Sequence, residues 1–146
     1  MKYKLFLHAF YVSFVLLFSC SVEPAPINYG DDHCFLCDMT VVDKTHAAEY
    51  VTNKGRSYTF DAVECLVRKI VKDDNEANMA FVLVADYANQ GNLIAAKSAT
   101  YLISEKIKSP MGANLSAFSE VKTAQEFLEE HGGKLFTWEE LKTKFK

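Results

Sequence analysis

Sulfur side chains gather near the start of the chain, in the sequence HCFLCDM at residues 33–39. Cys34, Cys37 and Met39 place two thiols and a thioether within six positions. Such a donor set favours Cu(I) or zinc over hard cations such as Mg²⁺. Zinc sites use Cys, His and carboxylate ligands, whereas Cu(I) also accepts thioether sulfur. The thioether of Met39 therefore favours a Cu(I) site.

The same cysteines allow three other interpretations. Cys34 and Cys37 are spaced for a structural disulfide, and either of them is a possible disulfide partner for Cys65. A Cys-x-x-Cys pair is also typical of thiol-disulfide oxidoreductases, although there it normally follows a buried strand and opens a helix. A zinc site needs further ligands, which His33, His46 or Cys65 would supply. The sequence leaves these alternatives open.

Cys65 lies in a stretch with helical periodicity, and on a helical wheel it falls opposite the apolar stripe. We therefore expect it to be exposed or to lie between domains, and the alternative is a role as a second metal ligand or in contact with a partner. No Ser, His and Asp set and no phosphate-binding glycine loop is apparent, so we expect a binding and transfer protein and not an enzyme. The net charge of −3 and the pI near 5.8 provide no basic field for nucleic acid.

The N-terminus has the pattern of an export signal. Lys2 and Lys4 precede an apolar run over residues 5–18, which is short for a permanent membrane span. The run ends in LFSC at residues 17–20, which resembles a lipobox, so we expect cleavage before Cys20 and acylation of this cysteine. The mature chain would then be a lipoprotein of the cell envelope, anchored to a membrane and facing the periplasm or the exterior. Plain secretion and a retained signal anchor are the alternatives.

The remaining chain predicts a linker followed by two similar halves. Residues 1–19 are the expected signal peptide, and residues 20–32 the membrane-tethering linker. Residues 33–88 predict a first ββαβ unit. Its elements are strands at 47–51 and 56–60 around a turn at Gly55, a helix at 61–72 and a strand at 79–85.

Residues 89–146 predict a second ββαβ unit. Its elements are strands at 93–96 and 100–103, a loop at 109–112, a helix that ends at Gly132 and a strand at 135–136. Thr137 and Glu140 have the spacing of a capping box and begin a last short helix. The predicted fold is therefore α+β, with two linked ββαβ units and a short C-terminal helix.

Several motifs follow one another in an order that resembles a known family. They are the lipobox and linker, the CFLCDM sequence at 34–39, Gly55 with TFD at 59–61 and Cys65, PMG at 110–112 with Ala117 and Phe118, the glycine pair at 132–133, and WEEL at 138–141. This pattern is similar to the NosL-type copper lipoproteins, which assist the assembly of nitrous oxide reductase. The resemblance covers nearly the whole mature chain and implies the same two ββαβ units.

The resemblance also implies a ligand set and a role. By position it implies Cys37, Met39 and Met111 as Cu(I) ligands, with Cys34 as a further one. Taken alone, Met111 fits a core position, because methionine fills irregular gaps. The implied role is that of a copper chaperone that delivers Cu(I) to a client, either nitrous oxide reductase or its membrane-bound maturation complex.

Two positions depart from the family pattern. The family often has glycine where this chain has Asp38, and a second acid where this chain has Ala62. Asp38 would either crowd the ligand loop or stand near the metal as an acceptor. Because Ala62 stands at this position, the chain lacks whatever role the second acid has in the family.

Overall fold

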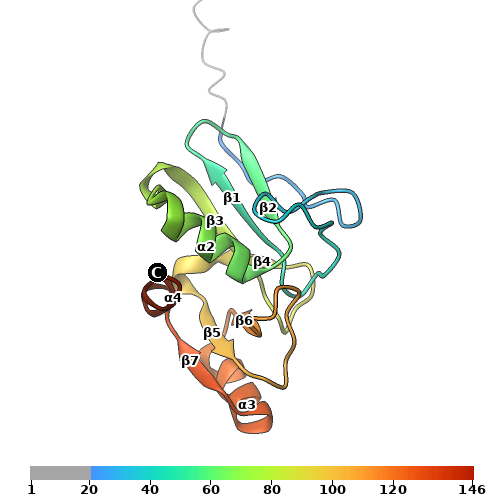
Figure 1. Cartoon of the computed structure of the whole chain (residues 1–146), viewed down its shortest axis with the longest axis vertical. Helices are drawn as coiled ribbons and strands as arrows, with labels where there is room; N and C mark the ends of the chain where they lie inside the picture. The colour runs from blue at the N-terminus through green and yellow to red at the C-terminus, as the bar shows by residue number, and fades with distance from the viewer. Residues whose placement is uncertain (1–20) are drawn as a thin grey trace, which may run out of the picture.

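The computed structural model describes residues 21–146, which form an α+β fold with two small antiparallel sheets and three helices (Figure 1). The predicted fold class is confirmed. The expected signal peptide and Cys20 lie outside the described residues. Among the residues described, no helix has the length and apolar character needed to cross a membrane.

The first sheet has four strands in the order β2-β1-β3-β4. They are β1 (Ala48–Thr52), β2 (Ser57–Phe60), β3 (Met79–Ala85) and β4 (Leu93–Ala95). The predicted hairpin between β1 and β2 is present, and Gly55 supplies its turn with φ of +79°. Helix α2 (Val63–Asp73) and the 3₁₀ turn η1 (Glu76–Asn78) connect β2 to β3. Asp74 ends α2 in the left-handed conformation and donates its N–H to Ile70 O.

The second sheet has three strands in the order β6-β5-β7. They are β5 (Thr100–Ile103), β6 (Leu115–Phe118) and β7 (Lys134–Phe136), and helix α3 (Val121–His131) connects β6 to β7. Helix α4 (Trp138–Lys144) follows, and its predicted capping box between Thr137 and Glu140 is present. The second sheet with α3 is therefore a ββαβ unit.

The strand at 93–95 differs from the prediction. We expected it to open the second unit, but β4 pairs with β3 in the first sheet. The turn between these strands is held by Asp86 N, which donates to Asn92 O at 2.8 Å, so the chain folds straight back onto β3. The 3₁₀ turn η2 (Ala96–Ser98) then leads into β5. The missing strand of the second unit is β6, which follows the loop expected at 109–112.

One core joins the two sheets. Helix α2 packs against β1 and β2 of the first sheet and also against β6 and α4. Large apolar side chains from both halves are fully buried together, among them Leu66, Tyr101, Leu115 and Trp138. Burying a side chain of this size contributes about 1.5–3 kcal/mol. The N-terminal end of α2 therefore lies at the junction of the two units, as Figure 1 shows.

The N-terminal segment lies against the first sheet. Ala25 N donates to Glu49 Oε1 at 3.1 Å, and Gly30 N donates to Val41 O at 2.9 Å. Glu49 is fully buried on β1. Residues 25–30 are therefore part of the folded domain, and only the residues before them are candidates for a free tether.

Candidate metal centre

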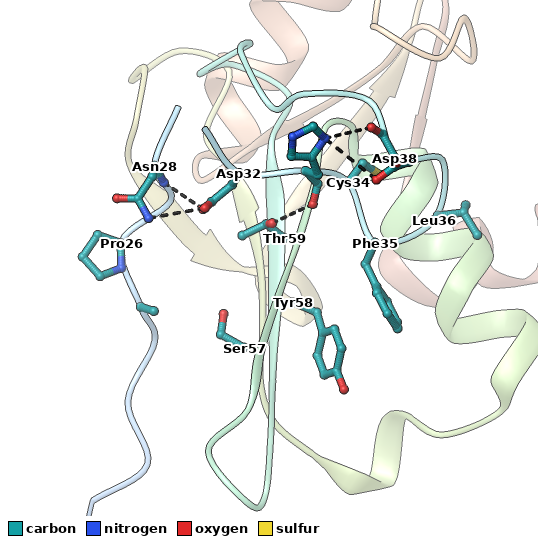
Figure 2. A pocket seen from close by; sticks show the side chains of 12 residues that line it. Pro26, Asn28, Asp32, Cys34, Phe35, Leu36, Asp38, Ser57, Tyr58 and Thr59 are labelled. Carbon is teal, nitrogen blue, oxygen red and sulfur yellow. Dashed lines mark hydrogen bonds and ion pairs between the residues drawn. The ribbon is translucent and has the colours of Figure 1, made fainter. Parts of the chain in front are cut away.

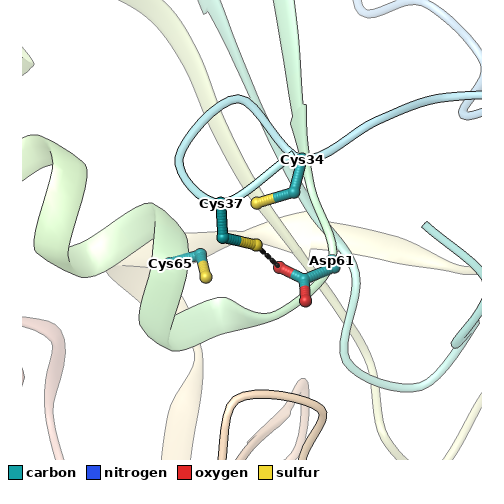
Figure 3. Close-up of side chains that lie close together, drawn as sticks. All are labelled: Cys34, Cys37, Asp61 and Cys65. Carbon is teal, nitrogen blue, oxygen red and sulfur yellow. Dashed lines mark hydrogen bonds between the residues drawn. The ribbon is translucent and has the colours of Figure 1, made fainter. Parts of the chain in front are cut away.

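The predicted metal-binding segment is a compact loop. The ends of residues 33–40 pair as an isolated antiparallel bridge. Within the loop, Cys34 N donates to Met39 O at 2.8 Å, and Asp38 N donates to Cys34 O at 2.9 Å. This folded backbone directs the thiols of Cys34 and Cys37 toward the same point (Figure 3).

The loop is anchored to β2, the strand that leads into α2. Phe35 N donates to Thr59 O at 2.9 Å, and Thr59 Oγ1 donates to His33 O at 3.1 Å. The ring of Phe35 packs on Tyr58, with 4.3 Å between the ring centroids. The loop is therefore held beside the β2–α2 connection, where Asp61 lies.

Both departures from the family pattern have a structural explanation. Asp38 has φ of +64°, in the left-handed region that glycine adopts without cost and that aspartate tolerates. Its side chain is 97 % exposed and lies 3.8 Å from His33 Nδ1, so it does not crowd the thiols. Ala62 is the N-cap residue of α2 and provides no side-chain cap. An acid at position 62 would occupy a favoured capping position.

Four side chains converge where the loop meets the start of α2. The Sγ atoms of Cys34, Cys37 and Cys65 and a carboxylate oxygen of Asp61 all lie within 4.8 Å of one another (Figure 3). Cys37 Sγ donates to Asp61 Oδ1 at 3.6 Å. Residues from the loop, the β2–α2 connection and the helix thus form one group, which we call the thiol cluster.

The thiol cluster is largely shielded from solvent. The exposed fraction is 2 % for Cys34, 2 % for Asp61 and 0 % for Cys65, whereas Cys37 is half-buried. All three cysteines are free thiols. Neither predicted disulfide alternative, Cys34 with Cys37 or one of them with Cys65, is formed. The cluster therefore offers three thiols as sulfur ligands.

Hydrogen bonding within the cluster separates the pKa values of the thiols. The hydrogen bond with Cys65 lowers the pKa of Cys34 to about 6, against the opposing effect of burial. The same hydrogen bond raises the pKa of Cys65 far above its usual range, because Cys65 keeps its proton to donate it. Burial raises the pKa of Cys37 to about 11. Cys34 is therefore the first thiol to ionise and provides a buried negative charge for a cation.

The burial of Cys65 corrects the expectation that it is exposed and agrees with the other position expected for it, between the two units. The wheel places Cys65 opposite the apolar stripe, and that inference assumes that α2 packs on one side only. In the structure the loop at 34–37 covers this part of the helix, and β6 packs against it as well. A helix with neighbours on several sides has no exposed face at such a position.

The two methionines of the predicted ligand set lie in different surroundings. Met39 is 49 % exposed and follows the thiols on the outer part of the loop. Met111 is half-buried and packs against the core that contains Cys34 and Cys65. The structure thus brings Cys34 and Cys37 together, leaves Met39 accessible, and places Met111 against the same core from the second unit.

A buried carboxylate holds the Met111 loop against α2. Glu64, fully buried, accepts hydrogen bonds from Ser109 Oγ and from Ala113 N, the latter at 3.2 Å. Ser109 Oγ also accepts from Asn114 N at 2.8 Å. Because Glu64 directly precedes Cys65, these bonds connect the loop of the second unit to the helix of the thiol cluster.

A second polar group links the two units away from the thiols. His46 Nδ1 lies 2.7 Å from Asp43 Oδ2, and His46 Nε2 lies 3.1 Å from Ser116 Oγ. This is the Ser, His and Asp set that was not apparent in the sequence. His46 and Ser116 are buried, so no substrate reaches the hydroxyl, and the group joins the segment before β1 to β6. With both ring nitrogens engaged, His46 stands outside the thiol cluster.

A groove of about 530 Å³ lies beside the metal-binding loop (Figure 2). Its walls come from the N-terminal segment, the loop and β2. The lining includes Pro26, Asn28, Asp32, Cys34, Phe35 and Tyr58. The loop is therefore open to solvent along this groove, whose lining includes one member of the thiol cluster, Cys34.

Comparison with known proteins identifies the family of this chain. The family model NosL matches residues 25–145, which is nearly all of the described chain. The chain belongs to the NosL family. The resemblance drawn from its motifs is confirmed.

This NosL-family chain also matches individual relatives. It is 27 % identical over 128 residues to the copper-binding lipoprotein NosL of Stutzerimonas stutzeri, and the match covers 83 % of this chain and 67 % of that protein. The crystal structure of the copper chaperone NosL from Shewanella denitrificans matches with a TM-score of 0.72 and 22 % identity. That match covers 83 % of this chain and 96 % of the other, and it shows a shared fold.

In the thiol cluster of this NosL-family chain, Asp61 was not predicted as a site residue, and Cys65 was predicted only as an alternative metal ligand or disulfide partner. Cys65 lies in the first turn of α2, and Asp61 directly precedes the N-cap residue Ala62, so the two are close in the chain at the start of the helix. Their spacing was therefore visible in the sequence. What the sequence lacks is the position of the loop that carries Cys34 and Cys37, since only tertiary packing places it over α2.

Proposed function

We propose that this protein is an exported copper chaperone that holds Cu(I) and passes it to another protein without catalysing a reaction. The observation that carries the proposal is the thiol cluster, which places three sulfur atoms and a carboxylate within 4.8 Å in a chain of the NosL family. Thiolate sulfur is a soft ligand, and soft ligands select Cu(I) over hard cations.

The proposed Cu(I) ligands are the thiols of Cys34 and Cys37 and the thioethers of Met39 and Met111. The low pKa of Cys34 supports binding, because a ligating thiol must be deprotonated. Thioethers bind without losing a proton. Zinc rarely takes thioether ligands, so the two methionines favour copper when both metals are present.

The surface around the loop supports transfer to a partner. The large apolar side chains that are exposed in the described chain are Phe35, Met39, Val42 and Val121, and the first three lie in or next to the metal-binding loop. Exposed apolar groups at one place favour protein contact. We propose that the partner is a copper-requiring client, nitrous oxide reductase or its maturation complex at the membrane.

The N-terminal region supports attachment to a membrane. We propose that residues 1–19 are removed, that Cys20 is acylated, and that the residues before Ala25 form the tether in the periplasm or outside the cell. Labelling cells with a radioactive fatty acid tests this proposal. The parent protein should take up label and Cys20→Ala should not. Equal labelling of both proteins would exclude lipidation at Cys20.

Anaerobic titration of the reduced protein with Cu(I), followed by native mass measurement, tests copper binding. The parent should bind one copper ion. Cys37→Ser should lose far more affinity than Met39→Leu, because a thiolate is the stronger ligand. Met79→Leu, in β3, is the matched methionine control and should bind as the parent does. A parent protein that binds no Cu(I) would end the proposal.

Zinc is a second candidate, because three cysteines and one carboxylate also form a typical zinc donor set. Competition between Cu(I) and Zn²⁺ at equal concentrations distinguishes the two metals. The chaperone proposal predicts copper in the recovered protein, whereas a structural zinc site predicts zinc and a large loss of thermal stability when zinc is removed.

A further inference from the structure

We propose that copper occupies two positions in this protein, which share Cys37. The inner position is formed by Cys34, Cys65 and Asp61 together with Cys37. The outer position is formed by Cys37 with the thioethers of Met39 and Met111, so that the four ligands proposed above are divided between the two positions. This inference rests on the proposed copper-binding function and assigns to Cys65 and Asp61 the role of retaining the ion.

The dimensions of the thiol cluster suit a single metal ion. A tetrahedral ion with metal–sulfur bonds of about 2.3 Å places its ligand atoms roughly 3.8 Å apart. The four ligand atoms of the cluster lie within 4.8 Å of one another, and Cys37 Sγ is already 3.6 Å from Asp61 Oδ1. A contraction of about 1 Å, within the reach of side-chain rotation, therefore completes the inner position.

One oxygen of the Asp61 carboxylate is available to bind a metal ion. Its Oδ1 accepts from Cys37, and its Oδ2 is buried with no hydrogen-bond partner among the described residues. A buried acceptor without a partner costs about 1–3 kcal/mol. Coordination of a cation between Asp61 and the thiols removes that cost.

Accessibility decreases in order from Met39 to Cys65. Met39 is about half exposed and Cys37 is half-buried, while Cys34 and Cys65 are buried. A partner protein can therefore most readily meet a copper ion at Met39 and Cys37. An ion at the inner position is retained until it returns to Cys37.

Movement between the two positions is a ligand exchange in which copper stays Cu(I). The bonds from the ion to Cys65, Cys34 and Asp61 break, the Cys65 thiolate takes up a proton from the buffered solvent, and the two thioethers of the outer position form new bonds to the ion. Cys37 stays bound throughout. Because each state keeps thiolate sulfur on the metal, the ion is never released to solvent.

Competition with a phenanthroline-type Cu(I) chelator measures both positions in the full chain. Equilibrium competition gives the affinity, and stopped-flow absorbance gives the rate of copper transfer to the chelator. Cys65→Ala should lower the affinity by about tenfold or more and speed the transfer. Met39→Leu should leave the affinity within about threefold of the parent but slow the transfer, since it removes an outer ligand. Met79→Leu should change neither quantity.

The possible outcomes separate this inference from the proposed function. If the parent binds Cu(I) and Cys65→Ala matches it in affinity and transfer rate, the inner position is wrong and the copper-binding function stands. If the parent binds no Cu(I), both are wrong. Thermal unfolding checks that Cys65→Ala is folded. If it is not, Asp61→Asn replaces it, and copper X-ray absorption of the parent decides the issue: three sulfur neighbours with one oxygen neighbour support the inner position, and neighbours of sulfur alone exclude it.

Discussion

Ser109 Oγ, in the loop of the second unit, donates a hydrogen bond to Oε1 of Glu64, the residue that precedes Cys65 in α2. The two residues are 45 positions apart in the chain. Their contact fixes the loop that contains Met111 relative to the helix of the thiol cluster. The proposed ligands of the two units thus share a buried link.

Removal of the Ser109 hydroxyl should weaken this link. Ser109→Ala leaves the buried carboxylate of Glu64 without one of its two donors, so the free energy of unfolding should fall by about 1–3 kcal/mol. Ser98→Ala, at an exposed serine in η2, should change it by less than about 0.5 kcal/mol. Urea unfolding measures both variants. Equal stability of Ser109→Ala and the parent would show that the contact contributes nothing.

Met111 should act as a clasp between the two units when copper is bound. In Met111→Ala, Cu(I) should stay on the cysteine loop but with lower affinity. Copper binding should protect residues 109–112 from proteolysis in the parent and not in the variant, because a ligand shifts the population toward the state it binds more tightly. Unchanged affinity together with the parent's protection pattern would return Met111 to a core role.

Copper affinity should fall as the pH is lowered. The pKa of Cys37 is raised to about 11, so its proton must leave on binding throughout the neutral range. Each thiol that loses a proton makes the affinity rise about tenfold per pH unit. Cys34, with a pKa of about 6, adds to this dependence only below that value. Chelator competition between about pH 6.5 and 8.5 measures the slope, and a flat profile would contradict thiolate binding.

A half-buried ion pair should make stability sensitive to acid. Glu76 accepts from Lys142 Nζ at 2.6 Å and from Trp138 Nε1 at 2.9 Å. Burial raises the pKa of Glu76, but these hydrogen bonds outweigh it and the net pKa is lowered. A carboxylate with a lowered pKa stabilises the fold at pH values above its pKa in the unfolded chain. This stabilisation is lost as the pH falls through its pKa in the folded protein.

Glu76→Gln should therefore destabilise the protein at pH 7 by about 1.5–3 kcal/mol. The difference from the parent should shrink as the pH is lowered below about 4. Glu130→Gln, at a carboxylate that is 75 % exposed, is the control and should have little effect at either pH. Thermal unfolding at the two pH values gives the comparison. A difference that grows in acid would contradict the assigned pKa direction.

Gly133 should tolerate no side chain. Its φ is +115°, and a Cβ at this position would lie 2.2 Å from Ile103 O, a backbone atom of β5. Gly133→Ala should cost at least about 2 kcal/mol of stability. Gly91→Ala, with φ of +78° and open space around it, should cost only about 1 kcal/mol. Equal losses in the two variants, measured in urea, would show that the close contact relaxes freely.

The sequence by itself determined the local elements and the type of chemistry. Periodicity places α2 and α3, Gly55 marks the first hairpin, and the Thr137–Glu140 spacing marks the start of α4, because these signals act between residues close in the chain. The soft-donor chemistry of Cys34, Cys37 and Met39 likewise needs only the side chains. The same motifs were sufficient to indicate the NosL family.

Tertiary structure alone decided which strand joins which sheet and which residues complete the thiol cluster. The strand β4 has an apolar pattern that suits either sheet, and only the turn at 86–92 returns it to β3. Cys65 is buried because a loop 30 residues earlier in the chain folds over α2, and a helical wheel contains no information about distant segments. Contacts between residues far apart depend on how the elements pack, and one sequence read alone does not specify that packing.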